Sequence, residues 1–106
     1  MIRATTPYHE FVFTEDPSAF TRILITYSQE ENIVLEKEKS DLTIIENPAV
    51  EGQYIASYRM TQEEANLFDV GAVRVQVRVL TTNGDAMASV ISTLPIEEVL
   101  NDEVLT

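Results

Sequence analysis

Residues 72–80 read AVRVQVRVL, a stretch in which apolar and polar side chains alternate strictly. Such alternation is typical of a β-strand that buries one face, because successive side chains point to opposite sides of a sheet. The connection TTNGDA and the segment MASVISTL follow, so we expect the chain to fold back as a hairpin. Asn-Gly favours a two-residue type I′ turn, since both central residues need φ > 0. Asn83 and Gly84 are therefore predicted to be the central residues of the turn.

This turn would set the pairing of the two strands. Counting outward from it, one side of the hairpin carries the pairs Val79–Ala88, Val77–Val90, Val75–Ser92 and Val73–Leu94. One register thus satisfies both the turn and the alternation, and we expect this side to be buried.

The opposite side of the hairpin has a mixed composition. Its predicted pairs are Leu80–Met87, Arg78–Ser89, Gln76–Ile91 and Arg74–Thr93. Three apolar side chains beside two arginines are more typical of a protein–protein interface than of a solvated sheet face. The candidate interface residues are Leu80, Met87, Ile91, Arg74 and Arg78, with the arginines pairing with acidic groups of a partner.

The C-terminal segment offers an alternative for this face. Residues 95–106 are predicted to form a tail, and Val99 and Leu100 could cover the outer side of the hairpin within the same chain. Val99 and Leu100 are otherwise further interface candidates. Apolar residues of the tail fall at helical spacing, yet residues 94–96 could simply prolong the last strand.

The rest of the chain contains further short strands. Strands are predicted at residues 8–13, 20–28, 33–39, 41–45 and 53–60. The segment TQEEANLF is the one helical signal, with Thr61 as N-cap and Glu64 completing a capping box. Seven short strands with one helical turn before the sixth predict an all-β, immunoglobulin-like antiparallel β-sandwich. The sandwich would comprise residues 1–94, including an N-terminal arm at residues 1–7, followed by the tail.

Composition excludes several classes of partner. The chain of 106 residues carries eighteen acidic and seven basic residues, a formal net charge of −11. This balance argues against nucleic acid and against anionic membranes, both of which need clustered Lys and Arg. There is no cysteine, no signal peptide and no membrane-spanning run, so a bacterial cytoplasmic protein is expected unless it enters a particle.

Residues suited to catalysis are scarce. His9 is the only histidine, and no GxSxG motif is present. Adjacent acid pairs fall in turns, a helix cap and the tail, where solvated charge explains them. We predict no catalytic, metal-binding or cofactor-binding residues and no enzymatic activity. A ligand-binding sandwich that recognises carbohydrate or protein is the alternative, with Tyr8, Tyr27, Tyr54 and Tyr58 available, although Tyr54 and Tyr58 lie on a face that indicates core.

Six segments, taken in order, resemble one known family. They are RATTPYHEF (3–11), RILITYSQ (22–29), VLEKEKSDLTI (34–44), RMTQEEANLF (59–68), VRVQVRVLTTNGDAMAS (73–89) and VLNDEVL (99–105). Together they are similar to small prophage-encoded proteins of Gram-positive bacteria. The chain departs from that pattern at Ala4, where the family's arm usually has Gly, and at Tyr8, where Thr is common.

The resemblance implies an immunoglobulin-like sandwich similar to the N-terminal module of siphophage baseplate or upper-fibre proteins. It implies a structural role in the virion, with other virion proteins or further copies of the chain as partners. It brings no catalytic residues to this sequence.

Overall fold

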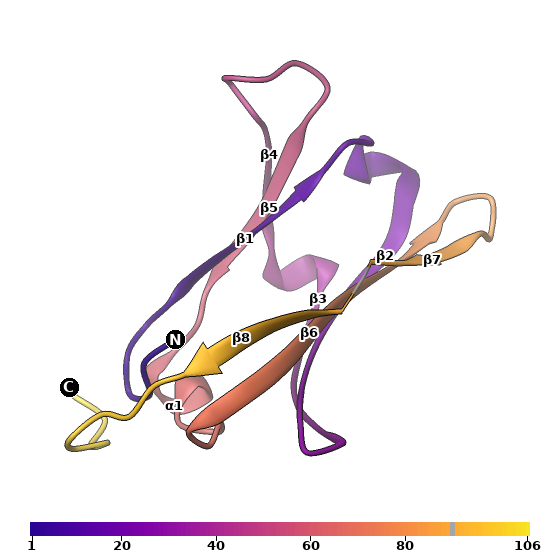
Figure 1. The fold of residues 1–106 in the computed structure, drawn as a ribbon. Coiled ribbons are helices and arrows are strands. Elements are labelled where there is room, and N and C mark those ends of the chain that lie inside the picture. The colour runs from indigo at the N-terminus through magenta and orange to yellow at the C-terminus, as the bar shows by residue number, and fades with distance from the viewer. Residues whose placement is uncertain (90) are drawn as a thin grey trace.

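Two antiparallel sheets pack face to face in the computed structural model, which describes residues 1–89 and 91–106 (Figure 1). One sheet has the order β1 (Tyr8–Phe13), β5 (Tyr54–Arg59) and β4 (Thr43–Glu46). The other has the order β3 (Asn32–Glu38), β2 (Phe20–Gln29), β6 (Gly71–Thr81) and β7 (Ala86–Ala88), and β8 (Ser92–Ile96) also pairs with β6. The short helices are η1 (Pro17–Ala19), η2 (Lys39–Asp41) and α1 (Gln62–Ala65). No described helix has the length and apolar character needed to cross a membrane.

The predicted all-β sandwich, with a short helical turn before the sixth strand, is confirmed. The strand order nevertheless differs from that of an immunoglobulin constant domain. There the second strand lies in the sheet of the first, fourth and fifth strands, whereas β2 here lies between β3 and β6. The likeness to an immunoglobulin domain therefore extends to the two-layer architecture and not to the pairing of β2.

The inner faces of both sheets form one core. Ile23, Ile25 and Tyr27 of β2 are fully buried, and Val73 and Val75 of β6 are buried beside them. Fully burying an aliphatic side chain of this size contributes about 1.5–3 kcal/mol. The remaining inward-facing valines of β6, at positions 77 and 79, are half-buried and pack against the core. The prediction that the four valines point inward is confirmed.

The helix α1 closes one end of the core. The Glu64 N–H donates to the Thr61 hydroxyl at 3.1 Å, and the Thr61 N–H donates to the Glu64 carboxylate at 3.0 Å. This reciprocal pair is the predicted capping box. The turn brings Ala65 and Phe68 into the core with no exposed surface.

The turn between β6 and β7 is not the predicted type I′ turn. The Gly84 N–H donates to the Thr81 carbonyl at 3.0 Å, and the Thr81 N–H donates to the Asp85 carbonyl at 2.8 Å. The loop therefore has three residues, and Gly84 alone among them has a positive φ, of 89°. This is the three-residue loop in which a type I turn is followed by a left-handed residue. The Asp85 N–H also donates to the Thr81 hydroxyl at 3.0 Å, a contact that stabilises the longer loop.

The longer loop displaces the register near the turn by one residue. Leu80, Val79 and Arg78 pair with Ala86, Met87 and Ala88, whereas the predicted partners were Met87, Ala88 and Ser89. Farther from the turn the predicted pairs Val75–Ser92, Arg74–Thr93 and Val73–Leu94 are present. The predicted pair Val77–Val90 falls on residue 90, which lies outside the described residues.

The register near the turn and the register farther from it are offset by one residue. The Ser89 N–H donates to the Val77 carbonyl at 2.8 Å, while Ser92 pairs with Val75. Between these two pairs the returning chain thus has one more residue than β6. The predicted seventh strand is consequently divided into β7 and β8. The last strand continues to Ile96, which is buried, so the interpretation that residues 94–96 prolong it is confirmed.

Candidate functional site

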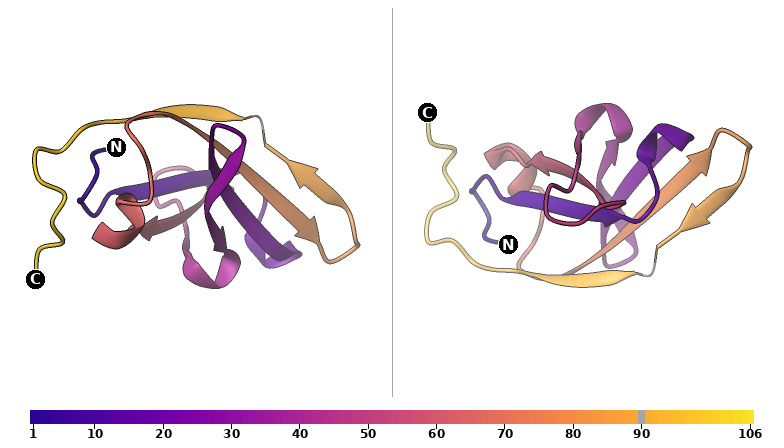
Figure 2. Two further views of the ribbon diagram at one scale, coloured as in Figure 1. Left: turned by 90° about the horizontal axis from the view of Figure 1, so that it is seen from below. Right: turned by 90° about the horizontal axis from the view of Figure 1, so that it is seen from above.

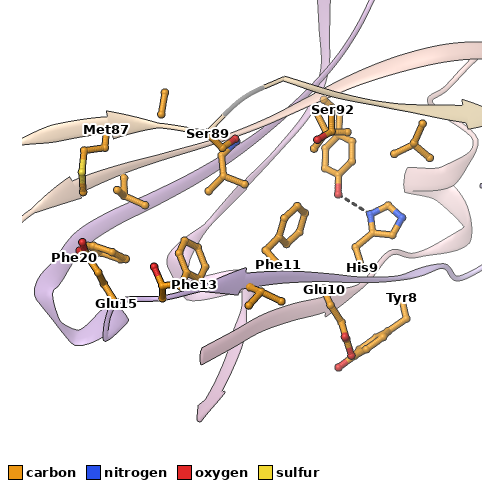
Figure 3. A pocket seen from close by; sticks show the side chains of 18 residues that line it. Tyr8, His9, Glu10, Phe11, Phe13, Glu15, Phe20, Met87, Ser89 and Ser92 are labelled. Atoms are coloured by element: carbon orange, nitrogen blue, oxygen red, sulfur yellow. Dashed lines mark hydrogen bonds between the residues drawn. The ribbon is translucent and has the colours of Figure 1, made fainter. Parts of the chain in front are cut away.

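A groove of about 740 Å³ runs along one side of the sandwich, between β1 and the β7–β8 segment (Figure 3). We call it the edge groove, because both of its walls are edges of their sheets. Phe11 and Phe13 of β1 project into it from one wall and Met87 of β7 from the other. The floor is formed by Phe20 and Tyr27 of β2 and by Val75, Val77 and Val79 of β6.

Alternation in β1 places the aromatic side chains in the groove. In the sequence YHEFVF, residues 9, 11 and 13 are half-buried, whereas Tyr8, Glu10 and Val12 are exposed. Figure 3 shows Tyr8 and Glu10 on the far side of β1, directed away from the groove. The groove is therefore apolar inside, and its charged lining residues are Glu10 and Glu15 at the rim.

A chain of hydrogen bonds closes one end of the edge groove. The Tyr58 hydroxyl donates to the Tyr27 hydroxyl, which lies 2.6 Å from Nδ1 of His9. Since Tyr27 has one proton, it donates to Nδ1, and the histidine is assigned as the neutral Nε2–H tautomer. Burial, together with the positive N-terminus, lowers the pKa of His9. Burial also raises the pKa of Tyr27 and of Tyr58 far above the usual value, so all three groups are neutral near pH 7.

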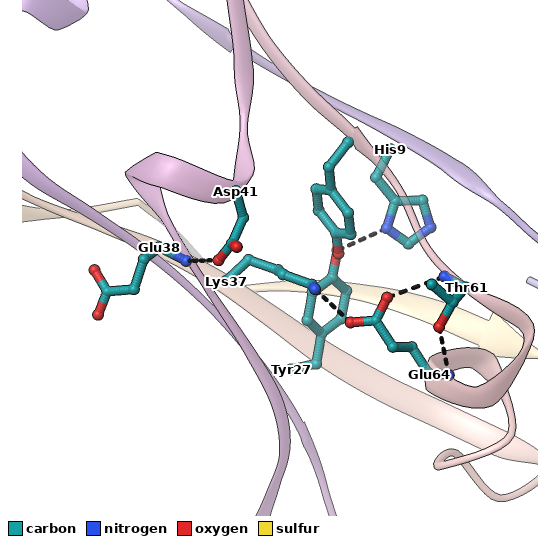
Figure 4. Close-up of polar contacts among 8 residues, drawn as sticks. His9, Tyr27, Lys37, Glu38, Asp41, Thr61 and Glu64 are labelled. Atoms are coloured by element: carbon teal, nitrogen blue, oxygen red, sulfur yellow. Dashed lines mark hydrogen bonds and ion pairs between the residues drawn. The ribbon is translucent and has the colours of Figure 1, made fainter.

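An ion pair between β3 and α1 lies next to these tyrosines (Figure 4). Lys37 of β3 pairs with the carboxylate of Glu64, and the Lys37 ammonium lies 5.6 Å from the centre of the Tyr58 ring. Burial opposes ionisation of Glu64, yet the hydrogen bonds from Lys37 and Thr61 prevail and lower its pKa. His9, the only imidazole of the chain, is thus a packed partner of Tyr27 rather than a group facing open solvent.

The predicted interface residues do not share one face. Met87 pairs with Val79 and projects into the edge groove, whereas Leu80 pairs with Ala86. The predicted association of Met87 with Leu80 is wrong, because the longer hairpin loop reverses the side to which Met87 points. Leu80 and Ile91 are 36% and 47% exposed.

The outer face of the larger sheet is more polar than the hairpin alone indicated. Arg74 and Arg78 are exposed, and Leu24 lies on one cross-strand row between Arg78 and Glu38. Arg22, on the same strand as Leu24, pairs with Glu38. Opposite charges flank the apolar residue, as on a solvated sheet face. A binding role for Arg74, Arg78, Leu80 and Ile91 stays a prediction.

The C-terminal tail does not cover the outer side of the hairpin. Figure 2 shows it at the end of the sandwich opposite the β6–β7 turn. Gln62 of α1 exchanges two hydrogen bonds with the backbone of Leu105, at 2.9 and 2.7 Å, and Asn66 donates to the Asp102 carbonyl at 2.9 Å. Leu100 is fully exposed and Val99 is half-buried. The alternative that Val99 and Leu100 cover the hairpin is therefore wrong.

The N-terminal arm is held by the end of β8 and by the chain that follows it. The Met1 amine donates to the Pro95 carbonyl at 2.7 Å, the Glu97 N–H donates to the Met1 carbonyl at 2.7 Å, and Arg3 pairs with Asp102 at 3.5 Å. Arm and tail thus stabilise each other at one end of the molecule and leave the edge groove open.

The tyrosines considered for carbohydrate binding are divided between core and surface. Tyr27 and Tyr58 are buried, as predicted for Tyr58, and Tyr54 is half-buried. Tyr8 is 53% exposed, with the Arg59 guanidinium 5.7 Å from its ring centre and its hydroxyl bonded to Ser57 at 2.8 Å. These four side chains do not form a shared stacking surface.

Reasoning from the sequence missed the edge groove. The alternation of His9, Phe11 and Phe13 is a signal from which an inward face of this strand could have been predicted, but no local signal tells which sheet edge the strand occupies. Within the described residues, no group of three or more His, Cys, Asp or Glu side chains is placed to hold a metal ion. Comparison of the chain with family models, with curated proteins and with solved structures finds no match.

Proposed function

We propose that the chain is an assembly module of a phage or prophage tail or baseplate, acting through contacts rather than catalysis. The ordered similarity of its segments to prophage-encoded proteins supports the setting. The single observation that supports the mode of action is the edge groove, an apolar channel between two strand edges. Open edges that flank apolar surface pair readily with other chains.

The make-up of the groove favours contact with protein. Its interior contains phenylalanine, valine and methionine side chains, and its imidazole is engaged with Tyr27. Apolar and aromatic surface of this kind is typical of the centre of a protein interface, where charged residues are depleted. The virion is the proposed location, and other virion proteins are the proposed partners.

Purified particles test the proposal. The bacterium that encodes the chain is induced to release its prophage, the particles are banded in a density gradient, and their proteins are identified by mass spectrometry. We expect the chain in the banded particles in a constant ratio to the major tail protein. Its presence in the lysate but not in the particles would contradict the proposal, as would a gene position inside a metabolic operon.

A further inference from the structure

We propose that the edge groove receives an extended segment of a different protein, which adds as a strand along β1 and carries Lys or Arg beside its apolar residues. This inference rests on the proposed role as an assembly module and names the chemistry of the partner. Three features support it: the free backbone groups of β1, the apolar interior of the groove and the acidic charge at its rim.

The free backbone groups of β1 follow from its pairing with β5. The Met60 N–H donates to the Pro7 carbonyl at 2.8 Å, so these two residues form a hydrogen-bonded pair. Bonded and non-bonded pairs alternate along an antiparallel ladder, and Tyr8 is opposite Arg59. The backbone N–H and C=O groups of Tyr8, Glu10 and Val12 therefore point toward the free edge. No strand in the described part of the chain pairs with that edge.

The side chains next to this edge suit an added strand. A strand laid along β1 would alternate its side chains between the groove and the solvent. Those turned inward would contact Phe11 and Phe13 of β1 and Met87 of the opposite wall, all of which line the groove. Met87 is 44% exposed, so an occupant would bury surface that the chain leaves in water.

Charge distinguishes between two possible occupants of the edge groove, a second copy of this chain and a different protein. The charged lining residues are Glu10 and Glu15, and the whole chain carries a net charge of −11. If two copies paired antiparallel about Glu10, the central residue of the free edge, the two Glu10 carboxylates would lie directly opposite. Like charges in that position are destabilising. A partner with basic residues beside its apolar ones gains from the same carboxylates, which is why we assign the groove to a different protein.

A synthetic strand serves as the probe. The peptide has about eight residues, alternating valine and lysine. It is N-methylated on the edge that would face away from β1, so that it cannot form larger sheets, and it is labelled for fluorescence anisotropy. We expect saturable binding to the full chain. A peptide methylated on both edges, and one with glutamate in place of lysine, should each bind about tenfold more weakly.

Variants of Glu10 separate the contribution of its backbone N–H to peptide binding from the contribution of its carboxylate. Glu10→Pro removes an N–H that points to the free edge, a position where proline is tolerated in edge strands. Glu10→Gln keeps the N–H and removes only the charge. We expect about tenfold weaker binding for Glu10→Pro and a smaller loss for Glu10→Gln. If Glu10→Pro does not fold, Met87→Asp tests the groove instead, by placing a charge in its apolar wall, and should also weaken binding.

Several results would overturn the inference. They are an absence of binding to the folded chain, equal binding of the doubly methylated peptide, or equal binding of the glutamate peptide. A dimer of the chain by light scattering that Glu10→Pro dissociates would identify a second copy as the occupant and overturn the assignment to a different protein. If the chain is found in particles but does not bind the peptide, this inference is contradicted and the proposed function stays intact. If the chain binds the peptide but is missing from particles, only the proposed function is contradicted.

Discussion

Replacing Tyr27 by phenylalanine should reveal how strongly the buried hydroxyl chain holds the two sheets together. The Tyr27 hydroxyl accepts from Tyr58 and donates to His9, which joins β2 to β5 and to β1. Tyr27 has no exposed surface and Tyr58 only 6%. Water therefore cannot replace the lost hydroxyl as a partner of Tyr58.

The expected loss in the free energy of unfolding depends on which buried groups lose their hydrogen-bond partners. Tyr27→Phe leaves a buried Tyr58 donor unsatisfied, and we expect a loss of about 2 kcal/mol in the free energy of unfolding. Tyr58→Phe leaves Tyr27 free to donate to His9 and should cost about 1 kcal/mol. In the double variant no buried donor is left unpaired, so the combined loss should be about 2 kcal/mol rather than the sum of the two.

Urea unfolding followed by far-ultraviolet circular dichroism measures the three losses under one condition. The slope of the free energy against urea should stay constant among the variants, because the area exposed on unfolding is the same. A Tyr27→Phe variant as stable as the wild type, or losses that simply add, would refute the hydroxyl chain as a coupled unit. Phe68→Ala is a control for core packing without a hydroxyl and should lose about 3–5 kcal/mol.

Three further predictions concern the hairpin, the helix cap and pH. Gly84→Ala should cost about 1 kcal/mol in urea unfolding because Gly84 has a φ of 89°, whereas Asn83→Ala should be nearly neutral; equal losses would favour a type I′ turn. Thr61→Ala should cost about 1 kcal/mol through loss of the capping box, and Thr61→Ser should recover most of it. The pKa of His9 is lower in the folded chain than in the unfolded one, so the unfolded chain binds more protons at mildly acidic pH. The free energy of unfolding should be at its full value above about pH 6.5 and should fall as the pH decreases toward the pKa of His9 in the folded chain. The fall should be smaller in His9→Gln. An equal fall in the wild type and in His9→Gln would contradict the assignment of a neutral histidine.

Local sequence signals predicted the elements of this fold closely. The strand at residues 8–13 has the predicted bounds, and the capping box at Thr61 and Glu64 forms as expected. The inward face of β6 was also readable, from Val73 to Val79. These features depend on residues within a few positions of one another, and alternation or a cap requires no knowledge of the rest of the chain.

The register of the hairpin could not be predicted from local sequence signals. A two-residue and a three-residue loop both fit TTNGDA, and the Thr81 hydroxyl bonded to the Asp85 N–H favours the longer one. One added loop residue moves Met87 from the outer side to the edge groove. From Ser92 onward the predicted register is present, with Ser92 opposite Val75. The segment MASVISTL lacks the strict alternation that would have excluded either the two-residue or the three-residue loop.

By itself the sequence determined that the chain makes short antiparallel strands with one buried side, since side-chain alternation, caps and turn residues act over a few neighbours. Only the tertiary structure decided that β2 pairs with β6, that Tyr27 meets Tyr58 and His9, and that β1 faces β7 and β8 across an open groove. These contacts join residues distant in the chain. Which of them form depends on how two whole sheets pack, and no short segment carries that information.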